Sequence, residues 1–199
     1  MWVSLEPWIV GDGEIPELRS GDMLCDVGLR AACRGIATSD AAAGVVELTE
    51  RGAAGAPLYR LTGVVTWGRQ PSSVLLDAGA FLVLAEPDTF RVSPQSRDAQ
   101  GMEPYSPSFH VPDVGTHASI VGTLEVVPSY EWDAFEFPDA RRDWRVTGIR
   151  LEQHSLVPLN GMANEVTRGA VVRAEVVDQL SRRTNPIGMS YLIDLKPTT

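Results

Sequence analysis

The sequence predicts an all-β protein. Three observations predict it: short apolar runs alternate with polar residues at a period of two, turn residues separate these runs, and patterns with helical spacing are scarce. The chain has 199 residues, of which 44% are hydrophobic, with 18 glycines and 14 prolines. This apolar content is too high for a chain that is disordered throughout. We therefore expect sandwiches or barrels built from short strands.

The expected strands are bounded by turn residues and are rich in β-branched residues or in strict alternation. The first spans 23–33, where every second residue is apolar, and the others span 45–49, 59–67, 73–76, 81–84, 120–127, 144–151 and 189–195. Gly148 interrupts the alternation of its strand, which predicts a β-bulge there. The range 167–180 fits either a helix or a strand that has Arg173 and Glu175 outward.

Periodicity also predicts which side chains form the core. Cys25 and Cys33 share the apolar phase of 23–33, so both are expected to be buried and reduced on one strand face. At the rise of a strand they would lie about 26 Å apart, too far for a disulfide. Trp67 shares its phase with the apolar residues of 59–67, which predicts a core position for its ring.

A weak internal similarity suggests two related β units. Residues 60–64 match 145–149, and residues 81–87 resemble 191–197 in the same order. Chance similarity between strands is the alternative. Each unit would be similar to a barrel of the oligonucleotide/oligosaccharide-binding (OB) kind in strand count and repeat length only. No family motif accompanies this likeness, so it implies no activity.

A proline-rich segment separates the two halves of the chain. Five of the 14 prolines lie between Glu86 and Gly115, which is typical of a linker or a long connection. The alternative is one sandwich crossed by a long loop. The predicted organisation is a first β unit at 1–87, a connection at 88–115, and a second β unit at 116–199 with an insertion near 153–166.

The net negative charge of the chain makes some classes of binding partner less favourable than others. The chain carries 17 basic and 26 acidic residues, a net charge of −9, and neither half is basic. Binding to duplex DNA is not expected, because it requires several cations to displace condensed counterions. No apolar stretch approaches 18 residues and the first residues carry no basic segment, so the sequence predicts neither a membrane span nor a secretory signal. We expect a cytoplasmic protein.

Motifs for cofactors, phosphates and nucleophilic catalysis are missing from the sequence. It contains no nucleophile elbow, no phosphate-binding loop and no zinc-protease helix motif. His110, Asp113 and His117 could supply three metal ligands, but Pro112 and Gly115 among them favour an ordinary connection. A serine hydrolase triad assembles only in space and leaves no signal here. We therefore predict no cofactor and no metal.

The candidate site is the segment 129–144, predicted as a hairpin between two strands. It holds five aromatic residues, five acids and two arginines. Rings beside carboxylates can stack on a sugar or bind an arginine-bearing partner, whereas the two arginines could bind an anion. The competing interpretation makes the rings plugs of the core, with the charges in water. The predicted site residues are Tyr130, Glu131, Trp132, Asp133, Glu136, Arg141 and Arg142.

These features favour a non-catalytic binding protein whose ligand is unidentified. Its expected partner is a basic or polar protein surface, or a small polar ligand, because the field of the chain is negative. One alternative is an enzyme on a β scaffold that uses acids of the same segment on a small polar substrate. A second alternative is binding to single-stranded nucleic acid by aromatic stacking.

Overall fold

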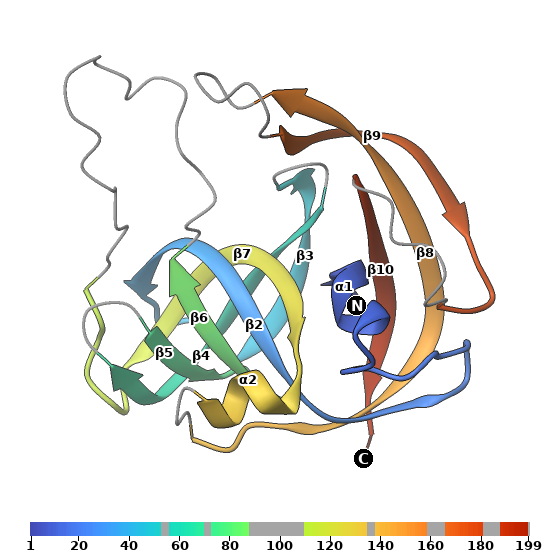
Figure 1. Cartoon of the computed structure of the whole chain (residues 1–199). Helices are drawn as coiled ribbons and strands as arrows, with labels where there is room; N and C mark the ends of the chain where they lie inside the picture. Colours follow the sequence, from blue (N-terminus) through green and yellow to red (C-terminus); the bar gives the residue numbers. More distant parts are fainter. Residues whose placement is uncertain are drawn as a thin grey trace.

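The chain folds into strands joined in one sheet, with two short helices (Figure 1). This computed structural model describes residues 1–52, 56–69, 73–87, 110–134, 138–158, 166–180 and 188–198. The predicted all-β class is confirmed. The strands are β1 (Trp2–Leu5), β2 (Met23–Thr38), β3 (Gly44–Arg51), β4 (Pro57–Arg69), β5 (Ser73–Asp77), β6 (Leu82–Pro87), β7 (His117–Val127), β8 (Arg142–Pro158), β9 (Val166–Val176) and β10 (Met189–Pro197). The helices are α1 (Pro7–Gly11) and α2 (Ser129–Ala134).

Strands β2 and β7 form the centre of the sheet, and the pairings on either side of them close into circuits. The sheet order is β3-β4-β5-β6-β2-β7-β1-β10-β8-β9, with further pairings between β4 and β7 and between β2 and β8. One circuit runs β4-β5-β6-β2-β7 and returns to β4. The other runs β7-β1-β10-β8-β2 and returns to β7. The antiparallel pair β2 and β7 is therefore common to both circuits.

These pairings cross the boundary predicted between the two β units. Strand β7 belongs to the predicted second unit, yet it pairs with β2 and β4 of the first. Strand β8 of the second unit also pairs with β2. The division into 1–87 and 116–199, and the repeat, stay predictions. Residues 88–109 of the predicted connection and 159–165 of the predicted insertion lie outside the described residues.

The main core is continuous through both circuits, and a smaller apolar cluster lies apart from it. Pro7 occupies the first turn of α1, where its fixed backbone angle suits a helix, and Ile9 and Val10 of this helix are buried in the main core. No helix among the described residues is long and apolar enough to cross a membrane. The smaller cluster consists of Leu75, Leu84, Val127, Trp132 and Ala140, with Trp67 and Leu82 packed against it.

The prediction that both cysteines face the core is wrong for Cys25. Cys33 is buried, whereas Cys25 is exposed, and neither forms a disulfide. The cause is Asp26, whose φ of 57° lies in the left-handed region, and the pairing of β2 with β8 shifts register between Leu24 and Val27. A bulge of this kind reverses which side chains face the core. Leu24 and Val27 are consequently buried, and the residues between them face solvent.

Trp67 also lies on a different face from the one predicted. The pairing of β4 with β5 shifts register between Val65 and Trp67. Val65 is buried in the main core, but the partly buried ring of Trp67 packs against the smaller cluster instead. By contrast, the bulge predicted at Gly148 is confirmed, since Gly148 pairs with Asp194 whereas the next partner, Leu195, pairs with Val146.

Candidate functional site

The predicted site segment 129–144 is not a hairpin. Residues 129–134 form the helix α2, and β8 begins at Arg142. The helix starts after Pro128, whose carbonyl accepts a hydrogen bond from the N–H of Trp132 (3.3 Å). In a hairpin strand Tyr130 and Trp132 would lie on one face, but this alternation does not apply in a helix. Phe135, Glu136 and Phe137 lie outside the described residues.

Trp132 of α2 is a core residue. Its side chain is 1% exposed and packs in the smaller apolar cluster. Its indole Nε1–H donates a hydrogen bond to the carbonyl of Pro138 (2.9 Å), so the polar atom of the ring is satisfied. Trp144 is equally buried and meets Phe81 edge to face. For these two rings the structure agrees with the plug interpretation.

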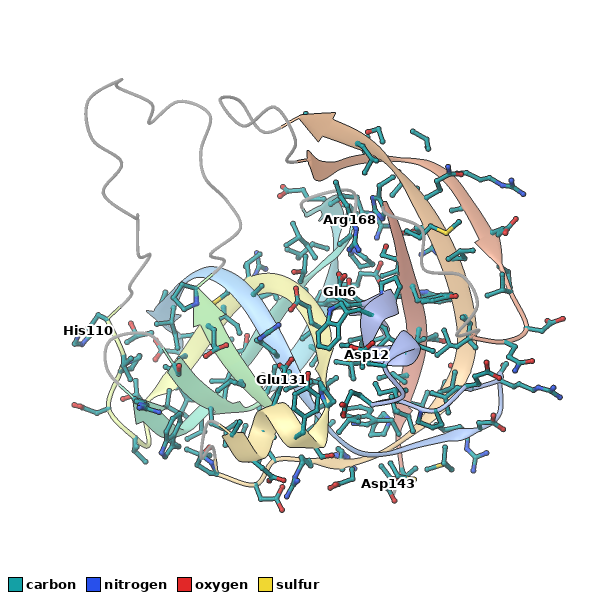
Figure 2. All side chains as sticks on the ribbon, viewed as in Figure 1. Glu6, Asp12, His110, Glu131, Asp143 and Arg168 are labelled. Atoms are coloured by element: carbon teal, nitrogen blue, oxygen red, sulfur yellow. The ribbon has the colours of Figure 1, made fainter. Side chains whose placement is uncertain are left out.

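Among the described aromatic residues of the segment, Tyr130 is the exposed one. Its side chain is 41% exposed, and its hydroxyl donates a hydrogen bond to Glu131 (3.3 Å). Partial desolvation and the carboxylates of Glu131, Glu14 and Asp12 raise the pKa of Tyr130. Figure 2 shows Glu131 beside α2 and Asp12 at the end of α1. We call these four residues, Tyr130, Glu131, Asp12 and Glu14, the Tyr130 surface.

The carboxylates of the Tyr130 surface have no counter-ion in the described part of the chain. None of the three makes an ion pair within 4.0 Å there. The nearby cation Arg30 is held instead by Glu125 at 2.8 Å, with Glu86 at 3.9 Å. Arg30 also acts on Glu131 through space, but one cation shared with Glu125 and Glu86 leaves the three carboxylates beside the exposed ring with a net negative field.

Arg141 forms ion pairs with a second group of acids. Its guanidinium lies 3.0 Å from Asp139, 3.1 Å from Asp133 and 3.5 Å from Asp26. Hydrogen bonds that Arg141 donates to Asp139 lower the pKa of Asp139 and raise the pKa of Arg141. Asp133, a predicted site residue, is thus an ion-pair partner of another predicted site residue. The three carboxylates around Arg141 would oppose the approach of an anion.

Arg142, the first residue of β8, donates hydrogen bonds to two backbone carbonyls of other segments. Its Nη2 donates to the carbonyl of Thr198 (2.7 Å), its Nη1 donates to the carbonyl of Ala80, and its guanidinium lies 5.3 Å from the ring centre of Trp144. A depression of about 430 Å³ beside it is lined by Phe81, Asp143 and others. The expectation that Arg141 and Arg142 together form an anion site finds no support in these contacts.

Sequence reasoning missed a buried polar group on β8 and β10. His154 Nε2 lies 2.7 Å from Ser190 Oγ, and Nδ1 lies 3.3 Å from the carbonyl oxygen of Gly169. His154 is 7% exposed and Ser190 is 8% exposed. Buried Glu152, on the same strand, pairs with Arg150 (3.5 Å). The sequence signal was polar alternation at 150, 152 and 154, which is ordinarily typical of a solvent-facing strand.

The three residues of the connection that could supply metal ligands do not form a metal site in the described structure. No group of three histidine, cysteine or acidic side chains among the described residues could hold a metal ion, and His110, Asp113 and His117 are all described. His110 lies on the side of the molecule away from Asp12 and Glu131 (Figure 2). With the geometry known, comparison with known proteins adds no assignment: no family model, no curated protein and no solved structure matches the chain.

Proposed function

We propose that the chain is a non-catalytic binding protein that receives a cationic segment of a partner on the Tyr130 surface. The observation that carries the proposal is the exposed ring of Tyr130 among three carboxylates without a counter-ion in the described chain. The proposal keeps Tyr130 and Glu131 from the predicted site. It leaves out Trp132, which is buried, and Arg141, which is already paired.

The chemistry of this surface suits a guanidinium better than a neutral ligand. A guanidinium that lies over the face of a tyrosine gains cation–π attraction, and its N–H groups can donate to a carboxylate in a bidentate pair. Here the ring and the carboxylate of Glu131 are adjacent on one helix, with Asp12 and Glu14 supplied by the segment that follows α1. Both interactions can therefore act on the same side chain of the partner.

The proposal is tested with a fluorescent peptide of alternating arginine and glycine, titrated with the intact chain at two salt concentrations. Tyr130→Ala combined with Glu131→Gln should weaken binding at least tenfold, a loss of about 1.4 kcal/mol. The matched control is Glu50→Gln, an exposed acid on β3 that removes the same charge elsewhere. Equal binding by all three proteins, or no binding by the native chain, contradicts the proposal.

An enzyme remains the second candidate, and the contact of Ser190 with His154 is the observation that favours it. A hydroxyl 2.7 Å from an imidazole nitrogen has the geometry of an activated nucleophile. Burial of both side chains opposes this role, because a substrate must reach the oxygen. Labelling of the native chain by a fluorophosphonate, lost in Ser190→Ala, would support the enzyme; no labelling would remove it.

Three further parts of the predicted function are nucleic-acid binding, a small polar ligand and a cytoplasmic location. The carboxylates of the Tyr130 surface would repel phosphate groups, so binding to single-stranded nucleic acid is the weakest alternative. A polar small molecule stays possible at the same ring and is tested by competition with the peptide. A cytoplasmic location remains part of the proposal. It is supported by the cysteines, because neither forms a disulfide and reduced thiols suit a reducing compartment.

A further inference from the structure

Strand β9 presents an apolar edge at one end of the sheet. It pairs with β8 alone, and its other edge has no strand partner among the described residues. Val172 is 62% exposed and Val176 is 79% exposed, and Leu156 and Val157 on the paired end of β8 are also exposed. Edge strands of this kind are templates for pairing with another chain unless charges or bulges prevent it.

The sequence of β9 is self-complementary about Ala174. Residues 171–177 read Val-Val-Arg-Ala-Glu-Val-Val. When this segment pairs antiparallel with its own copy and Ala174 faces Ala174, Arg173 lies opposite Glu175 and Val172 lies opposite Val176. The charges on this edge would therefore attract a second copy, whereas charges of one sign would repel it.

The backbone of β9 fits the same register. The N–H of Val177 donates to the carbonyl of Ile149 on β8 (3.0 Å). The backbone N–H and C=O groups of Val177, and of Glu175 and Arg173 at alternate positions before it, therefore point to β8. Alternate residues of a strand direct their hydrogen-bonding groups to opposite edges, which turns the groups of Ala174 and Val176 to the free edge. Two copies of Ala174 can thus exchange both hydrogen bonds at the centre of the pair.

We propose that two copies of the chain associate by antiparallel pairing of β9 about a two-fold axis at Ala174. A two-fold axis requires each copy to use the same patch, which a self-complementary strand satisfies. Moving the axis to residue 173 would place Arg173 opposite Arg173, and moving it to 175 would place Glu175 opposite Glu175. Only the register at Ala174 joins opposite charges.

The irregular part of β9 limits the contact to its second half. The pairing of β9 with β8 shifts register between Gln153 and His154 and again between His154 and Leu156. From Arg173 to Val176 the pairing is regular. Arg173 and Glu175 already form an ion pair within the strand (2.7 Å), and in the dimer four charges of alternating sign would lie side by side. We therefore expect a dimer of moderate affinity.

Charge reversal tests this register. Sedimentation equilibrium of the intact chain, in a series up to about 0.1 mM, should give an average mass that rises towards two chains, with about four-fifths of the chains in dimers at the highest concentration if the dissociation constant is about 10 µM. Arg173→Glu opposes acid to acid, and Glu175→Arg opposes base to base. Each variant alone should bind its own copy at least tenfold more weakly. An equal mixture of the two variants should restore the dimer, because every opposed pair then has opposite charges.

Two further variants of the chain serve as controls for the charge reversals. Arg51→Glu places the same charge change on β3, the other edge strand of the sheet, and should leave the dimer intact. Ala174→Pro removes the central N–H donor from the free edge and should give a monomer with unchanged circular dichroism. A monomeric native chain, a dimer that survives both charge reversals, or a mixture that stays monomeric would each overturn the proposal.

Discussion

The indole ring of Trp132 lies directly on Gly28. A Cβ atom at residue 28 would be 2.2 Å from Cζ3 of the indole, closer than real contacts allow. Gly28 belongs to β2 and pairs with Val127, the end of the strand that leads into α2. The absent side chain on β2 is therefore what lets α2 pack against the sheet, and this contact explains why Trp132 is buried while its neighbour Tyr130 is exposed.

Gly28→Ala should destabilise the fold by about 1–3 kcal/mol, because the ring must move to admit a methyl group in a packed site. Urea unfolding monitored by tryptophan fluorescence measures this loss. Gly35→Ala is the control in the same strand, since a Cβ at residue 35 meets nothing within 4 Å. Equal stability of the two variants would mean that Trp132 does not rest on β2 in solution.

Tyr59 predicts a loss of stability at alkaline pH. Its hydroxyl accepts a hydrogen bond from the N–H of Trp2 (2.8 Å) and donates one to the carbonyl of Trp2 (3.0 Å). Burial and the carboxylate of Glu47 raise the pKa of Tyr59 to about 12. The folded state therefore holds a proton that the unfolded state releases above pH about 10, and stability should fall by about 3 kcal/mol as pH rises towards 12.

The free energy of unfolding of the native chain and of Tyr59→Phe, measured across this alkaline range, tests the prediction. The phenylalanine variant should be less stable at neutral pH, because it leaves the Trp2 backbone groups without this partner. It should lose less stability on going to high pH than the native chain does. Parallel losses in the two proteins would assign the effect to other groups.

The two cysteines should react at different rates. Cys25 is exposed, whereas Cys33 is buried and donates a hydrogen bond to the carbonyl of Glu86 (3.3 Å). A maleimide should label one thiol of the native chain and the second only in denaturant. Partial desolvation and the charge of Asp143 raise the pKa of Cys25, so labelling should accelerate with alkaline pH. Cys25→Ser should abolish native labelling, and any remaining rapid reaction would show that Cys33 is accessible.

Cleavage within 88–109 should leave the two fragments bound to each other. Strand β7 follows this segment in the chain, yet it pairs with β2 and β4, which precede it. A protease site inserted in the segment permits a single cut, after which gel filtration should give one peak with the native circular dichroism spectrum. Two fragments that separate and each keep a β-type spectrum would establish the two independent units that the sequence predicts.

Local pattern was sufficient to predict most of the strands in the described residues, although β1 was not predicted. The alternation in 23–33 and 59–67 and the β-branched runs in the second half each correspond to a strand, and Gly148 marks a bulge as predicted. For 167–180 the sequence left a helix or a strand open, and the structure has β9 there. These features depend on neighbours along the chain, where side-chain period and turn residues act directly.

Which side chains face the core depended on small irregularities that the pattern does not record. One residue with positive φ, Asp26, turned Cys25 outward, and one register shift beside Val65 turned Trp67 to the second cluster. In the same way a short helix replaced the predicted hairpin at 129–134, because a ring could dock on Gly28. The outcomes at Cys25 and Trp132 involve contacts with segments distant in sequence, whereas the outcome at Trp67 involves the pairing with the next strand, β5.

The sequence by itself determined the all-β class, the positions of most strands, the negative charge and the self-complementary order of residues in β9. Only the tertiary structure decided that β2 and β7 are common to two circuits of pairing, that His154 meets Ser190, and that Tyr130 remains exposed beside acids from another segment. The physical reason is that hydrophobic period acts between neighbouring residues, whereas these contacts join residues that lie far apart in the chain, 36 positions in the case of His154 and Ser190.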